Sequence, residues 1–112
     1  MDECMNLVVY VDVDDTLVRS AGTKRIPIMA TVEHVRSLHA QGAQLFCWSA
    51  GGAEYARQSA AQCGIEQCFA AFLPKPQVMI DDQHVNEWGR FLAVHPMNCV
   101  NESAADYLRR LA

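Results

Sequence analysis

The sequence lacks any apolar run of the roughly 18 to 20 residues that a membrane-spanning helix needs, so no membrane segment is expected. Residues 1–4 are acidic and are not followed by the apolar segment of a secretory leader, so secretion is not expected either. Basic clusters and basic-aromatic stripes are also missing, and the formal net charge is −4. These absences argue against general nucleic-acid binding, although a few local cations could hold a small phosphorylated ligand.

The spacings by which cysteine and histidine bind zinc are absent as well. Five cysteines occur without a CxxC pair, and four histidines occur without HxH or HxxxH spacing. Four of the five cysteines lie in or beside apolar runs, which is typical of buried, reduced thiols. We therefore expect a cytoplasmic protein without disulfides.

Internal repeats, low-complexity tracts and linkers are not found. The chain has 112 residues, of which 51% are hydrophobic and 20% are charged, an ordinary globular balance. This length supports one hydrophobic core but not two, so residues 1–112 are expected to form a single domain. Nothing in the sequence excludes an oligomer.

Apolar residues recur with strand and helix periods in alternating segments. Strands are expected over residues 7–11, 43–48, 77–80 and 91–94, and helices over residues 31–41, 53–63 and from residue 101 or 103 onward. Thr31 is the expected N-cap of the first helix, and residues 18–27 are expected to form a loop or short hairpin. The alternation predicts an α/β domain with an open, mainly parallel, doubly wound sheet.

The order of the strands depends on one awkward segment. Residues 69–73 are apolar enough for a strand, but only residues 74–77 separate them from the strand expected next, and a parallel crossover needs a dozen or more. We therefore predict that the second helix carries the chain to the far side of the first strand. The first strand would then lie between those at 43–48 and 77–80, with a topological switch point and a ligand site beside Asp12.

Three carboxylates, Asp12, Asp14 and Asp15, follow the first expected strand within four positions. Their mutual repulsion calls for a cation, and Mg²⁺ is the natural partner of such hard oxygen ligands. The alternative is a solvated acidic turn. The basic residues in the following loop could contact a substrate phosphate or only screen these carboxylates; they are Arg19, Lys24 and Arg25.

Polar residues also stand at or near the ends of later apolar segments. Ser49 closes the segment 43–48, Lys75 precedes Pro76, and the pair Asp81-Asp82 closes the segment 77–80. Taken singly, each has an ordinary structural explanation: a capping serine, a surface lysine and an acidic turn.

Taken in order, these segments resemble the four motifs of the haloacid dehalogenase (HAD) superfamily of phosphohydrolases. The first motif, DxDxT, matches residues 12–16, and the second, an apolar strand ending in serine, matches residues 45–49. The third matches Lys75-Pro76, and the fourth, an apolar strand with an acidic pair, matches residues 78–82. The resemblance implies a HAD-like, Rossmann-like core that is trimmed and has no cap domain.

The resemblance further implies a magnesium-dependent phosphatase that acts through an aspartyl-phosphate. Its catalytic residues would be Asp12 as nucleophile, Asp14 as general acid and base, Ser49 and Lys75. The substrate phosphate would contact Thr16, Ser49, Ala50, Gly51 and Lys75. The magnesium ligands would be Asp12, Asp14 through its main-chain carbonyl, and Asp81 or Asp82, with Asp81 preferred.

A pocket without a cap implies a phosphorylated small molecule or an accessible phosphate on a macromolecule as substrate. Two other functions fit parts of the pattern. A non-catalytic binding or assembly module could keep this fold and these residues. A receiver-like phosphoacceptor domain needs an aspartate after a middle strand, where this chain has residues 48–51 and no carboxylate.

Overall fold

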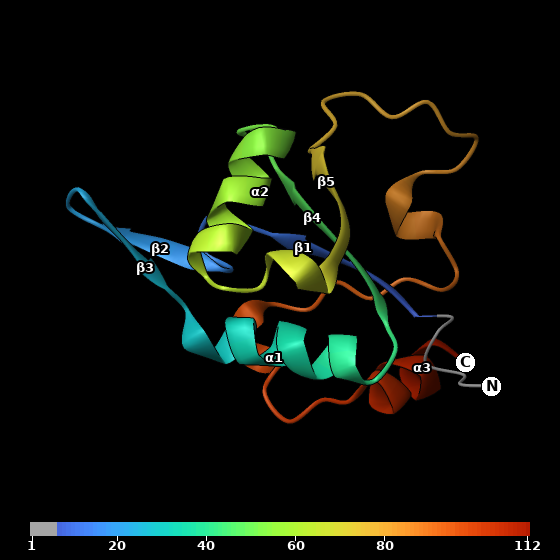
Figure 1. The fold of residues 1–112 in the computed structure, drawn as a ribbon. Coiled ribbons are helices and arrows are strands. Elements are labelled where there is room, and N and C mark those ends of the chain that lie inside the picture. The colour runs from blue at the N-terminus through green and yellow to red at the C-terminus, as the bar shows by residue number, and fades with distance from the viewer. Residues whose placement is uncertain (1–6) are drawn as a thin grey trace.

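The structure is a computed structural model that describes residues 7–112, and it belongs to the α/β class (Figure 1). Its strands are β1 (Val8–Asp12), β2 (Val18–Ala21), β3 (Lys24–Pro27), β4 (Gln44–Ser49) and β5 (Phe69–Pro74). Its α-helices are α1 (Met29–Ala40), α2 (Ala53–Gln62) and α3 (Ala104–Leu111). Short 3₁₀ turns lie at Glu66–Cys68, Val85–Glu87 and Pro96–Asn98.

Three parallel strands form the main sheet, in the order β1-β4-β5. Helix α1 connects β1 to β4 and helix α2 connects β4 to β5, so the chain advances across the sheet in one direction. The register pairs Asp12 with Trp48 and Ser49 with Pro74, which brings the carboxyl ends of the strands to one edge. A separate antiparallel hairpin, β2–β3, confirms the hairpin expected within residues 18–27.

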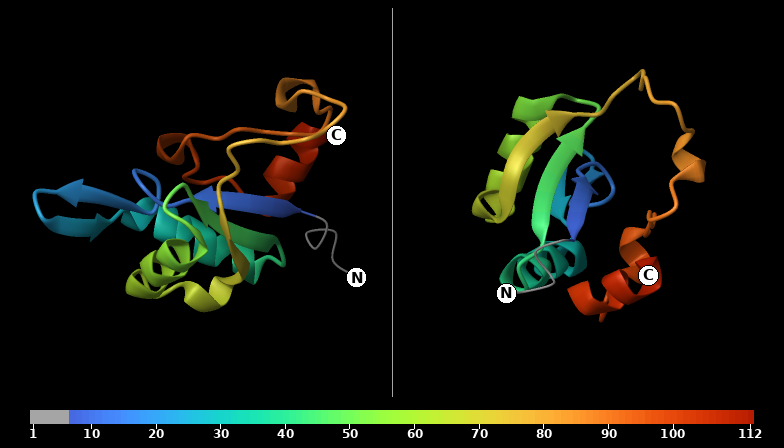
Figure 2. Two further views of the ribbon diagram at one scale, coloured as in Figure 1. Left: turned by 90° about the horizontal axis from the view of Figure 1, so that it is seen from above. Right: turned by 90° about the vertical axis from the view of Figure 1, so that its right-hand side faces the viewer.

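Alternation along β4 explains how the sheet is buried. Leu45, Cys47 and Ser49 are buried, whereas Phe46 and Trp48 on the other face are only half-buried. Figure 2 shows α1 and α2 on one side of the sheet, and the chain from β5 to α3 on the other. On α1 the buried residues Val32, Val35 and Leu38 form an inward stripe at helical spacing. Helix α2 buries Ala56, Ser59 and Ala60, whose small side chains allow its close approach to the sheet.

Two expected strands and the expected strand order are wrong. Residues 77–80 and 91–94 form no strand, and the side chains of Val78 and Ile80 are 78% and 98% exposed. The segment 69–73 is instead the third strand, because α2 returns the chain to the free edge of β4. Pro74 and Pro76 lack main-chain N–H groups, so the few residues after β5 cannot supply a further hydrogen-bonded strand beside β1. Strand β4 is therefore central, and the described sheet has no switch point beside Asp12.

The helix boundaries differ from expectation mainly at the first helix. Helix α1 begins at Met29, with Ile28 as an N-cap that makes no side-chain bond, so Thr31 is not the cap. The Thr31 hydroxyl is buried without a hydrogen-bond partner among the described residues. Helix α3 begins after Ser103, whose hydroxyl accepts from the N–H of Asp106 in a capping box, which confirms the second of the two expected starts.

Cysteine burial matches the expectation wherever it can be compared. Cys47, Cys63, Cys68 and Cys99 are buried and unpaired, while Cys4 lies outside the described residues. Over residues 7–112, no helix is both long enough and apolar enough to span a bilayer.

Candidate functional site

The loop after β1 is a tight turn held by its own main chain. The carbonyl of Val13 accepts hydrogen bonds from the N–H groups of Thr16, Leu17 and Val18, at 3.1, 2.8 and 3.1 Å. The side chains of Val13 and Leu17 are fully buried and anchor the loop in the core. Asp15 adopts φ 63°, a left-handed conformation that aspartate tolerates better than most residues. The polar side chains of the DxDxT segment are thereby left at the surface end of the strand.

The Asp12 carboxylate has two partners at the carboxyl end of the sheet. Lys75 Nζ lies 3.2 Å from Asp12 Oδ1, and Thr16 Oγ1 donates to Asp12 Oδ2 at 3.3 Å. The Asp12 and Lys75 side chains are 31% and 40% exposed, so the pair is open to solvent and to a ligand. The structure thus brings together Asp12, Thr16 and Lys75, which the sequence assigned to one site.

Ser49 ends the central strand β4, which lies between the strands that carry Asp12 and Lys75. Its carbonyl accepts from the N–H of Lys75 at 2.9 Å, and its buried hydroxyl accepts from the N–H of Gly51 at 3.0 Å. The Gly51 N–H, expected to bind a phosphate, is therefore already used within the turn. Because the Ser49 hydroxyl accepts that bond, its own hydrogen remains to be donated. Ala50 is exposed on the same turn.

Asp14 is held by Tyr55, which the sequence did not assign to it, and by Arg25, one of the basic residues expected to contact a phosphate or to screen these carboxylates. The Tyr55 hydroxyl donates to Asp14 Oδ1 at 2.6 Å, and Arg25 Nη2 lies 3.9 Å from the same oxygen. The bond to Asp14 raises the pKa of Tyr55, because it stabilises the protonated phenol. No local pattern around Tyr55 could have revealed this contact, which joins α2 to the loop after β1.

Asp81 and Asp82 do not join this group. Both are exposed, in the irregular chain after β5, and Asp81 Oδ1 accepts from the N–H of Gln83 at 2.9 Å in a local turn. Over residues 7–112, no three or more His, Cys, Asp or Glu side chains gather as metal ligands. The fourth motif is separated from the others because its expected strand does not form.

The loop itself still offers oxygen ligands that suit magnesium. The main-chain carbonyl of Asp14 accepts none of the hydrogen bonds that hold the turn, all of which end on Val13 or Val18. Magnesium commonly binds through one or two protein carboxylates together with water and substrate phosphate. The Asp12 carboxylate and the Asp14 carbonyl fit that requirement without a third carboxylate.

A buried thiol beneath the site can be excluded as its nucleophile. Burial, with the nearby charge of Asp12, raises the pKa of Cys47 to about 12. A thiolate is the reactive form of cysteine, so Cys47 stays protonated and inert near neutral pH. The strand-end carboxylate is the better nucleophile.

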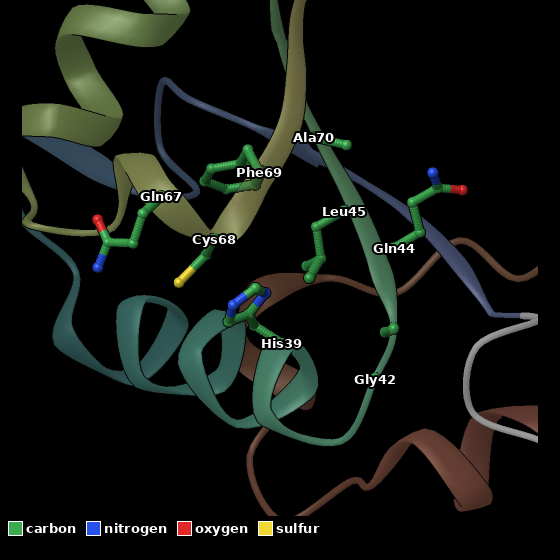
Figure 3. A pocket seen from close by; sticks show the side chains of 9 residues that line it. His39, Gly42, Gln44, Leu45, Gln67, Cys68, Phe69 and Ala70 are labelled. Carbon is green, nitrogen blue, oxygen red and sulfur yellow. The ribbon is translucent and has the colours of Figure 1, made fainter. Parts of the chain in front are cut away.

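The pocket shown in Figure 3 lies at the opposite end of the sheet. It has a volume of about 370 Å³ and opens beside the first residues of β4 and β5. His39, Gln67 and Cys68 contribute to its wall. Its place at the amino ends of the strands separates it from Asp12, Ser49 and Lys75.

Comparisons of the chain with family models, curated proteins and solved structures found no match.

Proposed function

We propose that this chain is a magnesium-dependent phosphohydrolase of the haloacid dehalogenase type, cytoplasmic and without a cap domain. The observation that supports it most is the contact of Lys75 with Asp12 across the end of β4, which Ser49 closes, at the carboxyl ends of three neighbouring parallel strands. A carboxylate nucleophile, a hydroxyl donor and an ammonium group are what phosphoryl transfer to an aspartate requires.

The core in this proposal is a trimmed version of the doubly wound fold. Apolar residues of the C-terminal region pack against the hydrophobic core, which supports a sheet covered on both faces (Figure 2); they are Leu92, Val94, Leu108 and Leu111. Neither the β2–β3 hairpin nor the turn after Ser49 is large enough to act as a cap domain.

The first half of the reaction forms a bond between Asp12 and phosphorus. An oxygen of the Asp12 carboxylate attacks, and the bond from phosphorus to the leaving oxygen breaks. Asp14 gives its proton to that oxygen, so the product leaves as an alcohol. Lys75 moves its charge from Asp12 to the phosphoryl oxygens, and Ser49 and Thr16 donate hydrogen bonds to them together with the Ala50 N–H.

The second half hydrolyses the acyl phosphate. Asp14, now ionised, takes a proton from water, and the resulting hydroxide attacks phosphorus. Inorganic phosphate leaves and the Asp12 carboxylate is restored. Magnesium, held by the Asp12 carboxylate and the Asp14 carbonyl, would neutralise charge as two anions approach each other. A further ligand from Asp81 or Asp82 would require residues 77–82 to move toward the end of β1.

The substrate in this proposal is a phosphomonoester, either a small molecule or an exposed phosphate on a macromolecule. The pair formed by Asp12 and Lys75 is open to solvent, which suits a substrate too large for an enclosed pocket. We expect slow hydrolysis of small substrates, because an open site excludes water poorly.

The test is magnesium-dependent release of phosphate from p-nitrophenyl phosphate, followed by sugar phosphates, nucleotides, phosphopeptides and phosphorylated oligonucleotides. Asp12→Asn should abolish release. Asp15→Asn is the matched control, because it makes the same chemical change in the same loop and asparagine also tolerates positive φ. Wild-type protein without activity on the whole panel, or active Asp12→Asn protein, would contradict the proposal.

A non-catalytic binding module is the second candidate, favoured by the separation of Asp81 and Asp82 from the other motifs. It predicts phosphate binding that Lys75→Met weakens, with no turnover. A receiver-like phosphoacceptor is disfavoured, because the central strand β4 ends in Ser49 where that domain needs a carboxylate.

A further inference from the structure

The contact between Tyr55 and Asp14 joins α2 to the loop that carries the DxDxT segment. At 2.6 Å it is a short hydrogen bond from a phenol to a carboxylate. We propose that Tyr55 is a positioning residue, which holds the Asp14 carboxylate in the direction needed for proton transfer, and that Arg25 in turn holds Tyr55. The inference depends on the proposed function, in which Asp14 is the general acid and base.

Asp14 needs such support because its own surroundings do not fix it. Its side chain is 61% exposed, so without a partner it would sample several rotamers. The Tyr55 bond ends on Oδ1, as does the contact with Arg25. That arrangement leaves Oδ2 as the oxygen that gives and takes the proton.

Gly51 provides the space in which the Tyr55 ring lies. A Cβ added at Gly51 would lie 2.8 Å from Tyr55 Cδ2, closer than real Cβ contacts, and 3.1 Å from Cγ, closer than most of them. These atoms are near the base of the ring, so the whole ring would have to shift. The absence of a side chain at position 51 therefore allows the hydroxyl to reach Asp14.

Arg25 contacts both the ring and the hydroxyl of Tyr55. Its Cζ lies 4.9 Å from the ring centroid, and its Nη2 donates to the Tyr55 hydroxyl at 2.8 Å. The guanidinium also donates to Ser59 Oγ at 3.2 Å and to Gln62 Oε1 at 3.3 Å. With these contacts Arg25 tethers the β2–β3 hairpin to α2. Of the two roles expected for the basic residues, Arg25 therefore fits charge balance near Asp14 better than contact with substrate.

The kinetic test compares Tyr55→Phe with Tyr107→Phe. Both remove a tyrosine hydroxyl that makes short side-chain bonds, but Tyr55 bonds to Asp14 and Arg25, whereas Tyr107 bonds to His34, at the junction of α3 with α1. Tyr55→Phe should lower kcat about tenfold with KM changed less than twofold, because substrate binding is untouched. Tyr107→Phe should leave both constants unchanged.

A second pair of variants tests the contact between Tyr55 and Asp14 by changing the space that Gly51 leaves for the ring. Gly51→Ala displaces the Tyr55 ring, whereas the control Gly89→Ala adds a Cβ that meets nothing within 4 Å. Gly51→Ala should lower kcat as Tyr55→Phe does, and the double variant should be no slower than the worse single one. Additive losses, or a loss confined to KM, would overturn the inference.

A measurement without turnover separates this inference from the proposed function. In urea unfolding, Tyr55→Phe should raise the unfolding equilibrium constant about fivefold more in wild-type protein than in Asp14→Ala protein, where only the bond from Arg25 to the hydroxyl is lost. Equal effects in both backgrounds would show that the two groups are not coupled. If they are coupled but the wild-type protein releases no phosphate, the proposed function fails, and the positioning role fails with it.

Discussion

Replacing Lys75 with methionine should separate catalysis from stability more clearly than any other single change. Asp12 is the last residue of β1 and Lys75 follows β5, and β4 lies between these two strands. Two strand spacings of about 4.8 Å put their main chains roughly 10 Å apart. The ammonium and carboxylate nevertheless meet at 3.2 Å, so the lysine side chain extends over the end of β4. The phosphate it serves should therefore lie above Ser49.

Lys75→Met should change the free energy of unfolding only slightly but should lower kcat strongly. The ion pair with Asp12 is more than a third exposed on the lysine side, and such pairs contribute about 0.2 to 1 kcal/mol to stability. The methionine keeps most of the hydrocarbon stem near the Trp48 ring, so the free energy of unfolding should change by less than about 1 kcal/mol. The charge on the transferring phosphoryl group loses a preorganised partner, which costs about 100-fold to 1,000-fold in kcat.

Steady-state phosphate release and urea denaturation measure these two quantities on the same preparation. Lys75→Arg is the control, because it keeps the charge and length and should retain activity within about tenfold of wild type. The reasoning is refuted if Lys75→Met keeps kcat within threefold of wild type while its free energy of unfolding falls by more than about 2 kcal/mol. Lys75 would then be a structural residue.

Three further predictions concern burial and protonation. Ser49→Ala removes the acceptor of the Gly51 N–H and should lower the free energy of unfolding by about 1 kcal/mol as well as slowing turnover, measured by urea denaturation and phosphate release. Burial lowers the pKa of His34 below 6.5, against a smaller opposing effect of Glu102, so its contribution to stability is complete above pH 6.5 and falls as the pH decreases toward the lowered value. His34→Gln should flatten the unfolding free energy between pH 5 and 7 if both proteins are compared by thermal or urea unfolding. With its pKa raised to about 12, Cys47 should resist iodoacetamide at pH 8 until the protein is unfolded, and mass spectrometry of the labelled peptide would detect any exception.

The parts of the fold that sequence analysis predicted are those with a strong local signal. Strand β4 contains a continuous apolar run at residues 45–48, and α1 carries Val32, Val35 and Leu38 at helical spacing. Residues 77–80 and 91–94 have equally apolar sequences but form no strand. A strand also needs a free edge within reach of the chain, and that condition cannot be read from a short apolar segment.

The Tyr55 contact shows a second limit of local patterns. Its partners, Arg25 and Asp14, lie 30 and 41 positions away in the chain, and the space for its ring depends on Gly51. Asp14 and Arg25 stand out in the sequence by their charged surroundings, but nothing there pairs either of them with Tyr55. Only packing of α2 beside the hairpin and the loop after β1 brings them together.

The predicted strand order is wrong, yet Asp12, Ser49 and Lys75 still lie at one end of the sheet, and the reason is geometric. In a parallel sheet every strand ends at the same edge, so residues that follow the strands share that edge in any order. The order of the strands determines only which of these side chains must span the greater distance to reach the others. With β4 in the centre, the residue after β5 must reach across a whole strand, which a lysine can do and an aspartate cannot. Asp81 and Asp82 follow a segment that is not a strand, so the same rule gives them no reason to approach Asp12.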